Sequence, residues 1–227
     1  MPSESQATFF SRITTALADR DPAVELPELP QDLNVARVVS ADNDLLALFV
    51  QRVGQAGMCP HRVANEQAAV VKIAELVRSI SARSAIIPNA PLPGRDAIVL
   101  ALEQQNVQLL NPDDPDAGFV ADVGITGVRL AVAETASMSV VSGQAHRRLA
   151  SLAVPVHIAI VRADQIVADL LDWGQEAPGQ STGEQRINTA LPANEVLISA
   201  MSKTADIEGI LVPGVHGPET VHVVIIE

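Results

Sequence analysis

The sequence is poor in cysteine, aromatic residues and basic residues. It has one cysteine, Cys59, one tryptophan, no tyrosine, and 15 basic against 27 acidic residues, for a formal net charge of −12. A lone cysteine forms no intramolecular disulfide and cannot supply the four thiolates of an iron–sulfur cluster, and it is typical of a reducing compartment. The negative charge repels nucleic-acid phosphates and anionic lipids, so no nucleic-acid partner is expected.

Several common motifs are also missing. No dinucleotide-binding G-x-G-x-x-G follows a strand, and there is no P-loop, H-E-x-x-H or G-x-S-x-G motif. Cys59 and His61 are only two potential ligands where structural zinc needs four, so we predict no metal and no cofactor. No run approaches the roughly 18 apolar residues of a membrane span, and the first residues do not resemble a signal peptide, so a cytoplasmic protein is expected.

The residues that are present predict an α/β domain. Hydrophobic residues make up 48% of the chain, enough for a large core built from Ala, Val, Leu and Ile. The first 33 residues read as an amphipathic helix (4–19) and a proline-rich connector, and 34–227 as one domain. Strands alternate with helices in its first half, which predicts a mostly parallel sheet flanked by helices. The expected helices are 42–56, 65–81 and 96–105, and the expected strands are 58–63, 85–87 and 107–110.

The second half is predicted to be richer in strands. The segment 122–127 is punctuated by glycines. Strands are expected at 128–133, 138–141, 154–161, 196–199 and 221–226, with a helix at 163–173 and a turn-rich stretch at 174–185.

The segment 199–218 is the first candidate site. We expect a strand to end at Ser199 and a short helix to open at Ala205, with Ser202 or Thr204 as its cap and Asp206 at its positive end. Lys203, one of only two lysines, lies on that turn. Such strand-to-helix turns bind anions in α/β sheets, although a plain capped turn would read the same way.

Other polar residues are further candidates. His216 and Gly217 form a glycine-flanked loop, which would lie at the opposite end of the sheet from Lys203 if the last strand were parallel to 196–199 and the loop did not fold over. Glu134 ends an apolar strand, where a carboxylate needs a partner or a function. Arg148 with Arg147 forms either an anion clamp or a solvated pair, and His157 is expected to be a core imidazole.

The motifs of the second half together resemble the LUD-domain family. They are Ala121-Asp122-Val123-Gly124-Ile125-Thr126, Ala133-Glu134-Thr135, Arg148-Leu149 with Ser151-Leu152, Pro155 to Ala159, Leu191-Pro192 with Asn194, Ser202 to Glu208, and Gly214 to Pro218. The resemblance implies a NagB/RpiA/CoA-transferase-like fold. It also implies action with two partner proteins, one bearing an iron–sulfur cluster, in oxidising L-lactate to pyruvate. Ala136-Ser137 stands where the family usually has Gly-Thr, and Ala200-Met201 where relatives tend to have Gly-Pro.

Three functions are compatible with the sequence. The leading one is a cluster-free accessory subunit of a lactate-oxidation system that binds a small anion, with Lys203, Arg148 and His216 holding it. The motif positions Thr126, Glu134, Ser202, Thr204, Asp206 and Gly217 complete the expected ligand-binding set. The alternatives are a stand-alone enzyme on a phosphorylated or CoA-linked metabolite, using Glu134 or His216, and a structural assembly module that docks through the 4–19 helix.

Overall fold

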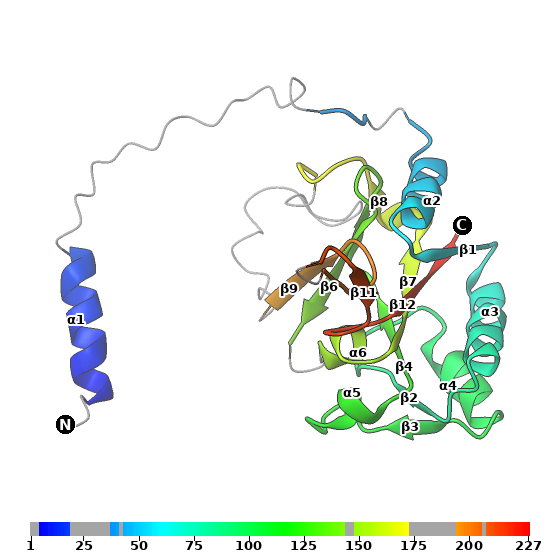
Figure 1. The fold of residues 1–227 in the computed structure, drawn as a ribbon, viewed down its shortest axis with the longest axis horizontal. Helices are drawn as coiled ribbons and strands as arrows, with labels where there is room; N and C mark the ends of the chain where they lie inside the picture. Colours follow the sequence, from blue (N-terminus) through cyan, green and yellow to red (C-terminus); the bar gives the residue numbers. More distant parts are fainter. Residues whose placement is uncertain (1–4, 19–36, 41–42, 144–147, 173–193, 206–207) are drawn as a thin grey trace. The chain divides into compact units, whose positions relative to one another are not determined.

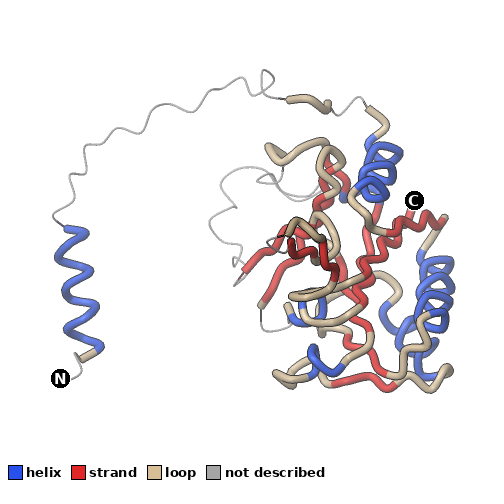
Figure 2. Tube along the Cα trace, in the orientation of Figure 1, coloured by secondary structure: helices blue, strands red, loops and turns tan. Residues whose placement is uncertain are grey.

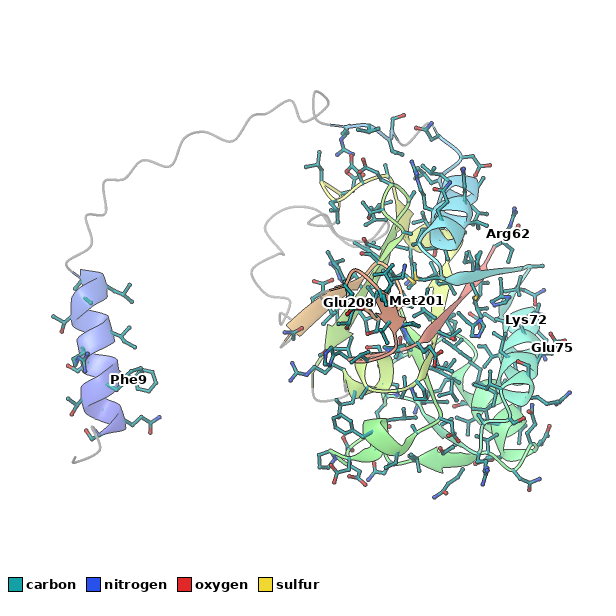
Figure 3. All side chains as sticks on the ribbon, viewed as in Figure 1. Phe9, Arg62, Lys72, Glu75, Met201 and Glu208 are labelled. Atoms are coloured by element: carbon teal, nitrogen blue, oxygen red, sulfur yellow. The ribbon has the colours of Figure 1, made fainter. Side chains whose placement is uncertain are left out.

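A computed structural model describes residues 5–18, 37–40, 43–143, 148–172, 194–205 and 208–227. The chain divides into two compact units, Met1–Val35 and Ala36–Glu227. In the first unit, the helix α1 (Gln6–Ala18) buries none of its residues, and Phe9, labelled in Figure 3, and Phe10 are each at least half exposed. The proline-rich connector, the turn-rich stretch 174–185, Arg147 and Asp206 lie outside the described residues.

The first half of the second unit follows the predicted alternation closely (Figure 1). Its elements are α2 (Leu45–Gln55), β1 (Cys59–Val63), α3 (Glu66–Ser79), β2 (Ser84–Ile86), α4 (Arg95–Glu103), β3 (Gln108–Leu110) and α5 (Ala117–Val120). Asn65 caps α3 as expected, because its side-chain oxygen accepts a hydrogen bond from the Ala68 amide at 2.9 Å.

A six-stranded parallel sheet forms the centre of this unit. Its order is β1-β12-β7-β4-β2-β3, with β4 (Val123–Gly127), β7 (Val156–Arg162) and β12 (Thr220–Ile226) in the middle. The expected α/β fold with a mostly parallel sheet is therefore confirmed. The strand β4 was not predicted, because two of its five residues are glycines, which interrupt the apolar pattern. Its first four residues are nevertheless buried.

The sheet is covered on both faces, as parallel sheets require. Alternate residues of β7 and β12 point to opposite sides. Ile158 and Val224 pack with α3 and α4, whereas Val161 and Val223 pack with α2 and a second sheet. Figure 2 shows the strands gathered in the middle of the unit with the helices outside them.

The second sheet has four strands in the order β8-β5-β6-β9. They are β5 (Leu130–Val132), β6 (Ser137–Ser142), β8 (Ile166–Val167) and β9 (Asn194–Ile198). A short helix, α6 (Leu149–Leu152), lies between β6 and β7 in sequence, and β10 (Lys203–Ala205) pairs with β11 (Leu211–Pro213) as an antiparallel hairpin.

Two sequence-based predictions are wrong. The expected helix at 163–173 is a three-residue 3-10 turn followed by β8, because Ile166 and Val167 pair with β5 instead of continuing the helix. In the described residues of that segment no helix opens at Ala205, because Lys203–Ala205 forms the strand β10. Met201 precedes this hairpin in sequence, and Glu208 belongs to the segment that connects its two strands; both residues are labelled in Figure 3.

None of the helices in the described part of the chain combines the length and the apolar character needed to cross a membrane.

Candidate functional site

The connections that leave the neighbouring strands β2 and β4 run over opposite faces of the parallel sheet. The connection after β2 passes through α4, whose Ile98 and Leu102 pack on one face of the parallel sheet. The connection after β4 passes through β5 and β6, whose Ala131 and Met138 pack on the other face. In open α/β sheets, the crevice outside the carboxyl ends of such a strand pair is where ligands bind.

A cavity of about 410 Å³ occupies this position, and we call it the switch-point crevice. Its walls are the loop that follows β2, the end of β4 and the segment that follows it, and parts of β6 and β7. The lining residues are Ile87, Pro88, Ala90 to Pro93, Ile125 to Arg129, Val140, Val141, Ile160 and Gln165. Most of them are apolar, and three side chains, Thr126, Arg129 and Gln165, bring polar groups, as in small-molecule sites.

The loop after β2 is held in place by Arg95, the first residue of α4. Its guanidinium donates to the carbonyl oxygen of Pro88 and, at 3.5 Å, to that of Ala90. Gly94 precedes the helix with a φ of +67°, a left-handed conformation that glycine adopts without steric cost. The proline-rich loop is therefore held by Arg95 at Pro88 and Ala90, and it ends in the left-handed turn at Gly94 where α4 begins.

Arg129 brings the positive charge to the crevice. Its Nε and Nη2 atoms each lie 2.6 Å from Oε1 of Glu195 on β9, and the Ser139 hydroxyl donates to the same oxygen. The Arg129 side chain is 33% exposed. A planar guanidinium held in this way is suited to pair with a carboxylate of a ligand.

Gln165 has a structural role at the crevice. Its side-chain nitrogen donates to the carbonyl oxygen of Val128 at 2.6 Å, and its oxygen accepts from the amide of Arg162 at 2.8 Å. These bonds tie the end of β7 to the segment that follows β4. Gln165 thereby keeps the backbone beside Arg129 in position.

Among the members of the predicted ligand-binding set that the structure describes, Thr126 alone lines the crevice. It is 4% exposed, and its Oγ1 lies 2.9 Å from Nε2 of His157 on the neighbouring strand β7. Burial lowers the pKa of His157 to about 4, so the ring is neutral near pH 7. The expectation that His157 is a core imidazole is correct for its burial, but only one of its two ring nitrogens has a partner in the described structure.

The predicted residues of 199–218 form a second neighbourhood, beside the amino ends of β7 and β12. The amide of Ser202 donates to Pro218 at 2.8 Å, and the amide of Gly214 donates to Ser202 at 3.0 Å, so the loop folds over onto β10. A β-carbon on Gly217 would lie 3.2 Å from the carbonyl oxygen of Leu152 in α6 and 3.3 Å from the Ser202 Cβ. This neighbourhood and the crevice are thus at opposite ends of the parallel strands.

The charged members of that neighbourhood are exposed. Lys203 donates to the carbonyl oxygen of Ala56 at 3.3 Å, and Ala56 is the residue that caps the carboxyl end of α2. A lysine at this position is favoured by the negative end of the helix, which is a structural role. His216 is exposed in the folded-over loop, Thr204 is on β10, and Arg148 is exposed at the start of α6.

Glu134 lies in the turn between β5 and β6 and is half-buried. Its amide donates to the carbonyl oxygen of Ala168 at 3.1 Å. In the same turn, Ala136 has a φ of +56°, a conformation that glycine adopts more easily, and this is the position where the family resemblance implies a glycine. The hydroxyl of Ser137 lies 2.7 Å from that of Thr135 and 2.6 Å from that of Ser199.

The crevice was not predicted from the sequence. Its walls come from segments that are far apart in sequence, and only the segment 125–129 overlaps a family motif, through Ile125 and Thr126. The proline-rich run directly after a buried strand, at 88–93, was the available signal, because loops at carboxyl ends of parallel strands carry ligand sites. Among the described residues, no group of three or more His, Cys, Asp or Glu side chains is placed to hold a metal ion.

Comparison with known proteins gives a consistent result. The family model described as "LUD domain" matches residues 46–226. Lactate utilization protein C of Deinococcus radiodurans is 38% identical over 108 residues, which is 47% of this chain and 47% of that protein. The protein of the same name from Shouchella clausii is 38% identical over 99 residues, 44% of this chain and 41% of the relative. The matched part thus covers less than half the length of each of these two relatives.

A longer sequence match and a match to a solved structure were also found. Lactate utilization protein C of Halalkalibacterium halodurans is 28% identical over 159 residues, 68% of this chain and 67% of that protein. The crystal structure of a DUF162 family protein from Deinococcus radiodurans matches with a TM-score of 0.54 and 22% identity, over 81% of this chain and 96% of that one. At this identity the likeness supports the fold alone.

Proposed function

This chain belongs to the LUD domain family, and from that membership we propose that it serves lactate utilization as a cluster-free accessory subunit that binds a small organic anion in the switch-point crevice. The support for the pathway is the name that three relatives share, lactate utilization protein C. The support for the ligand is the chemistry of the crevice.

The observation that carries the ligand proposal is the pairing of Arg129 with an otherwise apolar wall at the carboxyl ends of β2 and β4. A short 2-hydroxy or 2-keto acid has a carboxylate at one end and an alkyl group at the other. The guanidinium of Arg129 would hold the carboxylate, and Leu92 and Val140 would contact the alkyl part. Thr126 would contact an oxygen of the ligand between them.

The cluster-free role follows from the single cysteine. One thiolate cannot hold an iron–sulfur cluster, so an oxidation that passes electrons through such a cluster needs another chain to carry it. We propose that this chain assembles with an iron–sulfur protein and a further subunit. The negative net charge disfavours nucleic acid as the partner.

Growth on lactate tests the pathway. Deleting the gene should abolish growth on L-lactate as the sole carbon source while growth on pyruvate continues, and a plasmid copy of the gene should restore it. The tagged protein, purified from lactate-grown cells, should bring iron and distinct partner chains in fixed proportion, and the same tag on a protein from pyruvate-grown cells is the control. Normal growth of the deletion strain on L-lactate would remove the proposal.

A further inference from the structure

His157 and Thr126 form a pair whose hydrogen-bond polarity can be worked out from their surroundings. The His157 side chain is fully buried on β7, with Nε2 2.9 Å from Oγ1 of Thr126 on β4. The other ring nitrogen, Nδ1, is buried and has no hydrogen-bond partner in the described structure. A neutral imidazole has one N–H donor and one lone-pair acceptor, so only two arrangements are available.

The two arrangements differ in cost. If the proton were on Nδ1, a buried N–H would have no acceptor, which costs about 1–3 kcal/mol. If the proton is on Nε2, the N–H donates to Oγ1 of Thr126, and only a lone pair remains unpaired at Nδ1. Buried acceptors without a partner are tolerated more often than buried N–H groups without one. The second arrangement is therefore the stable one.

This arrangement fixes what Thr126 can do. Its oxygen accepts from His157, so its hydroxyl hydrogen is available for another acceptor, and Thr126 lines the switch-point crevice. We propose that His157 is a positioning residue that turns Thr126 into a hydrogen-bond donor to the ligand, and that the crevice thereby selects ligands with a carbonyl, hydroxyl or carboxylate oxygen at this point. The proposal rests on the proposed function for the crevice as a ligand site.

Selection would operate against donors. A ligand with an ammonium or amide N–H at the same point would face the Thr126 hydroxyl hydrogen, and only one lone pair of Oγ1 remains after it accepts from His157. The hydroxyl must turn away to offer that lone pair, so a 2-amino acid should bind more weakly than the 2-keto acid of the same size. Pyruvate and L-alanine form such a pair of probes.

The tautomer can be measured directly in the full-length, ligand-free protein. Nitrogen NMR of ¹⁵N-histidine-labelled protein separates a protonated ring nitrogen from one with a lone pair, and His157→Gln identifies the signal. We expect a protonated Nε2 and a lone pair on Nδ1. A protonated Nδ1 would overturn the proposal and leave the proposed function in lactate utilization untouched.

Binding of pyruvate, followed by calorimetry, tests the consequence. Thr126→Val keeps the shape and removes the hydroxyl, and it should weaken pyruvate binding about tenfold. Thr126→Ser keeps the hydroxyl and should recover most of that loss. His157→Leu should weaken binding by a smaller factor, and His157→Gln, which keeps an N–H donor, should bind more tightly than His157→Leu.

Two other outcomes have defined meanings. Equal pyruvate affinity in Thr126→Val and wild type, or tighter binding of L-alanine than of pyruvate, would overturn the proposal. If the wild-type protein bound neither pyruvate nor L-lactate, the ligand named in the proposed function would be wrong, and the tautomer measured without ligand would still decide the role of His157.

Discussion

The carbonyl oxygen of Ala150 in α6 occupies the space where a side chain on Gly124 of β4 would be. A β-carbon built on Gly124 would lie only 1.8 Å from that oxygen and 2.7 Å from its carbonyl carbon. The absence of a side chain at Gly124 is thus what allows α6 to rest on the central strand, next to the Thr126–His157 pair.

Gly124→Ala should therefore destabilise the protein. The clash is with backbone atoms, so α6 must move away from β4, and we expect a loss of about 1–3 kcal/mol or more in the free energy of unfolding. Urea unfolding followed by circular dichroism measures it. Gly54→Ala is the matched control, because nothing lies within 4 Å of the position its β-carbon would take and it sits inside α2, where alanine should stabilise by about 0.5–1 kcal/mol.

Stability should fall as the pH drops from 6.5 to 4, because of His157. Burial lowers its pKa from 6.5 to about 4, so in this window the unfolded chain binds a proton that the folded protein does not. The free energy of unfolding should then decrease by up to about 1.4 kcal/mol per pH unit. His61 and His222, whose pKa values are also lowered by burial, add to the same trend.

Urea unfolding at pH 7, 6, 5 and 4 separates these contributions. His157→Gln should show a shallower dependence on pH than the wild type, and His216→Gln, which removes an exposed imidazole, serves as the control. Identical slopes in wild type and His157→Gln would show that His157 does not set this dependence.

Arg129 should be required for anion binding. Arg129→Gln keeps much of the side chain and removes the positive charge, so the affinity for pyruvate should fall at least about tenfold. Arg62→Gln removes the charge of another arginine paired with a glutamate, Arg62 with Glu227 at 2.7 Å, and should leave the affinity unchanged. Equal losses in both variants would indicate a general electrostatic effect and not a site at the crevice.

Lys203 distinguishes the two candidate sites. The sequence predicts that it binds the anion, whereas its ammonium in the structure contacts the end of α2 and not the crevice. We expect Lys203→Ala to keep pyruvate affinity within about twofold, a change of under about half a kcal/mol. A loss of binding in Lys203→Ala with full binding in Arg129→Gln would move the site to the β10–β11 hairpin.

The predictable parts of the fold are those where local signals and tertiary contacts agree. In α3, the Asn65 cap and the buried stripe that includes Val70, Ile73 and Val77 specify the same helix that the structure contains. In 163–173, the apolar spacing is typical of a helix, but Ile166 and Val167 pair with β5. The next turn is then held by Arg37, which bridges Asp169 at 3.1 Å and Asp172 at 2.7 Å, and these long-range partners cannot be read from local spacing.

The candidate site also combines residues that local sequence patterns predict with residues that only long-range contacts bring together. Thr126 could be selected from its motif, because it is part of a recognisable family segment. Arg129 and the 87–93 loop could not be selected from the sequence. They come together because β2 and β4 are neighbours in the sheet, and no local sequence pattern predicts that pairing. The motif residues Ser202 and Gly217 do meet, through backbone bonds around Pro218 that place them at the amino ends of the strands.

The strand order also has a consequence for how the protein folds. β1 joins the parallel sheet only through β12, and His61 and His222, which touch across this pair, are 161 residues apart in sequence. Closing so large a loop has a high entropic cost, and sheets dominated by such distant pairings fold slowly. During synthesis, the edges of β1 and β7 have to wait unpaired until the segment around residue 222 has left the ribosome. The step that completes the sheet is therefore expected to be the slow one, and an unfinished chain with two open strand edges is the species most in need of a chaperone.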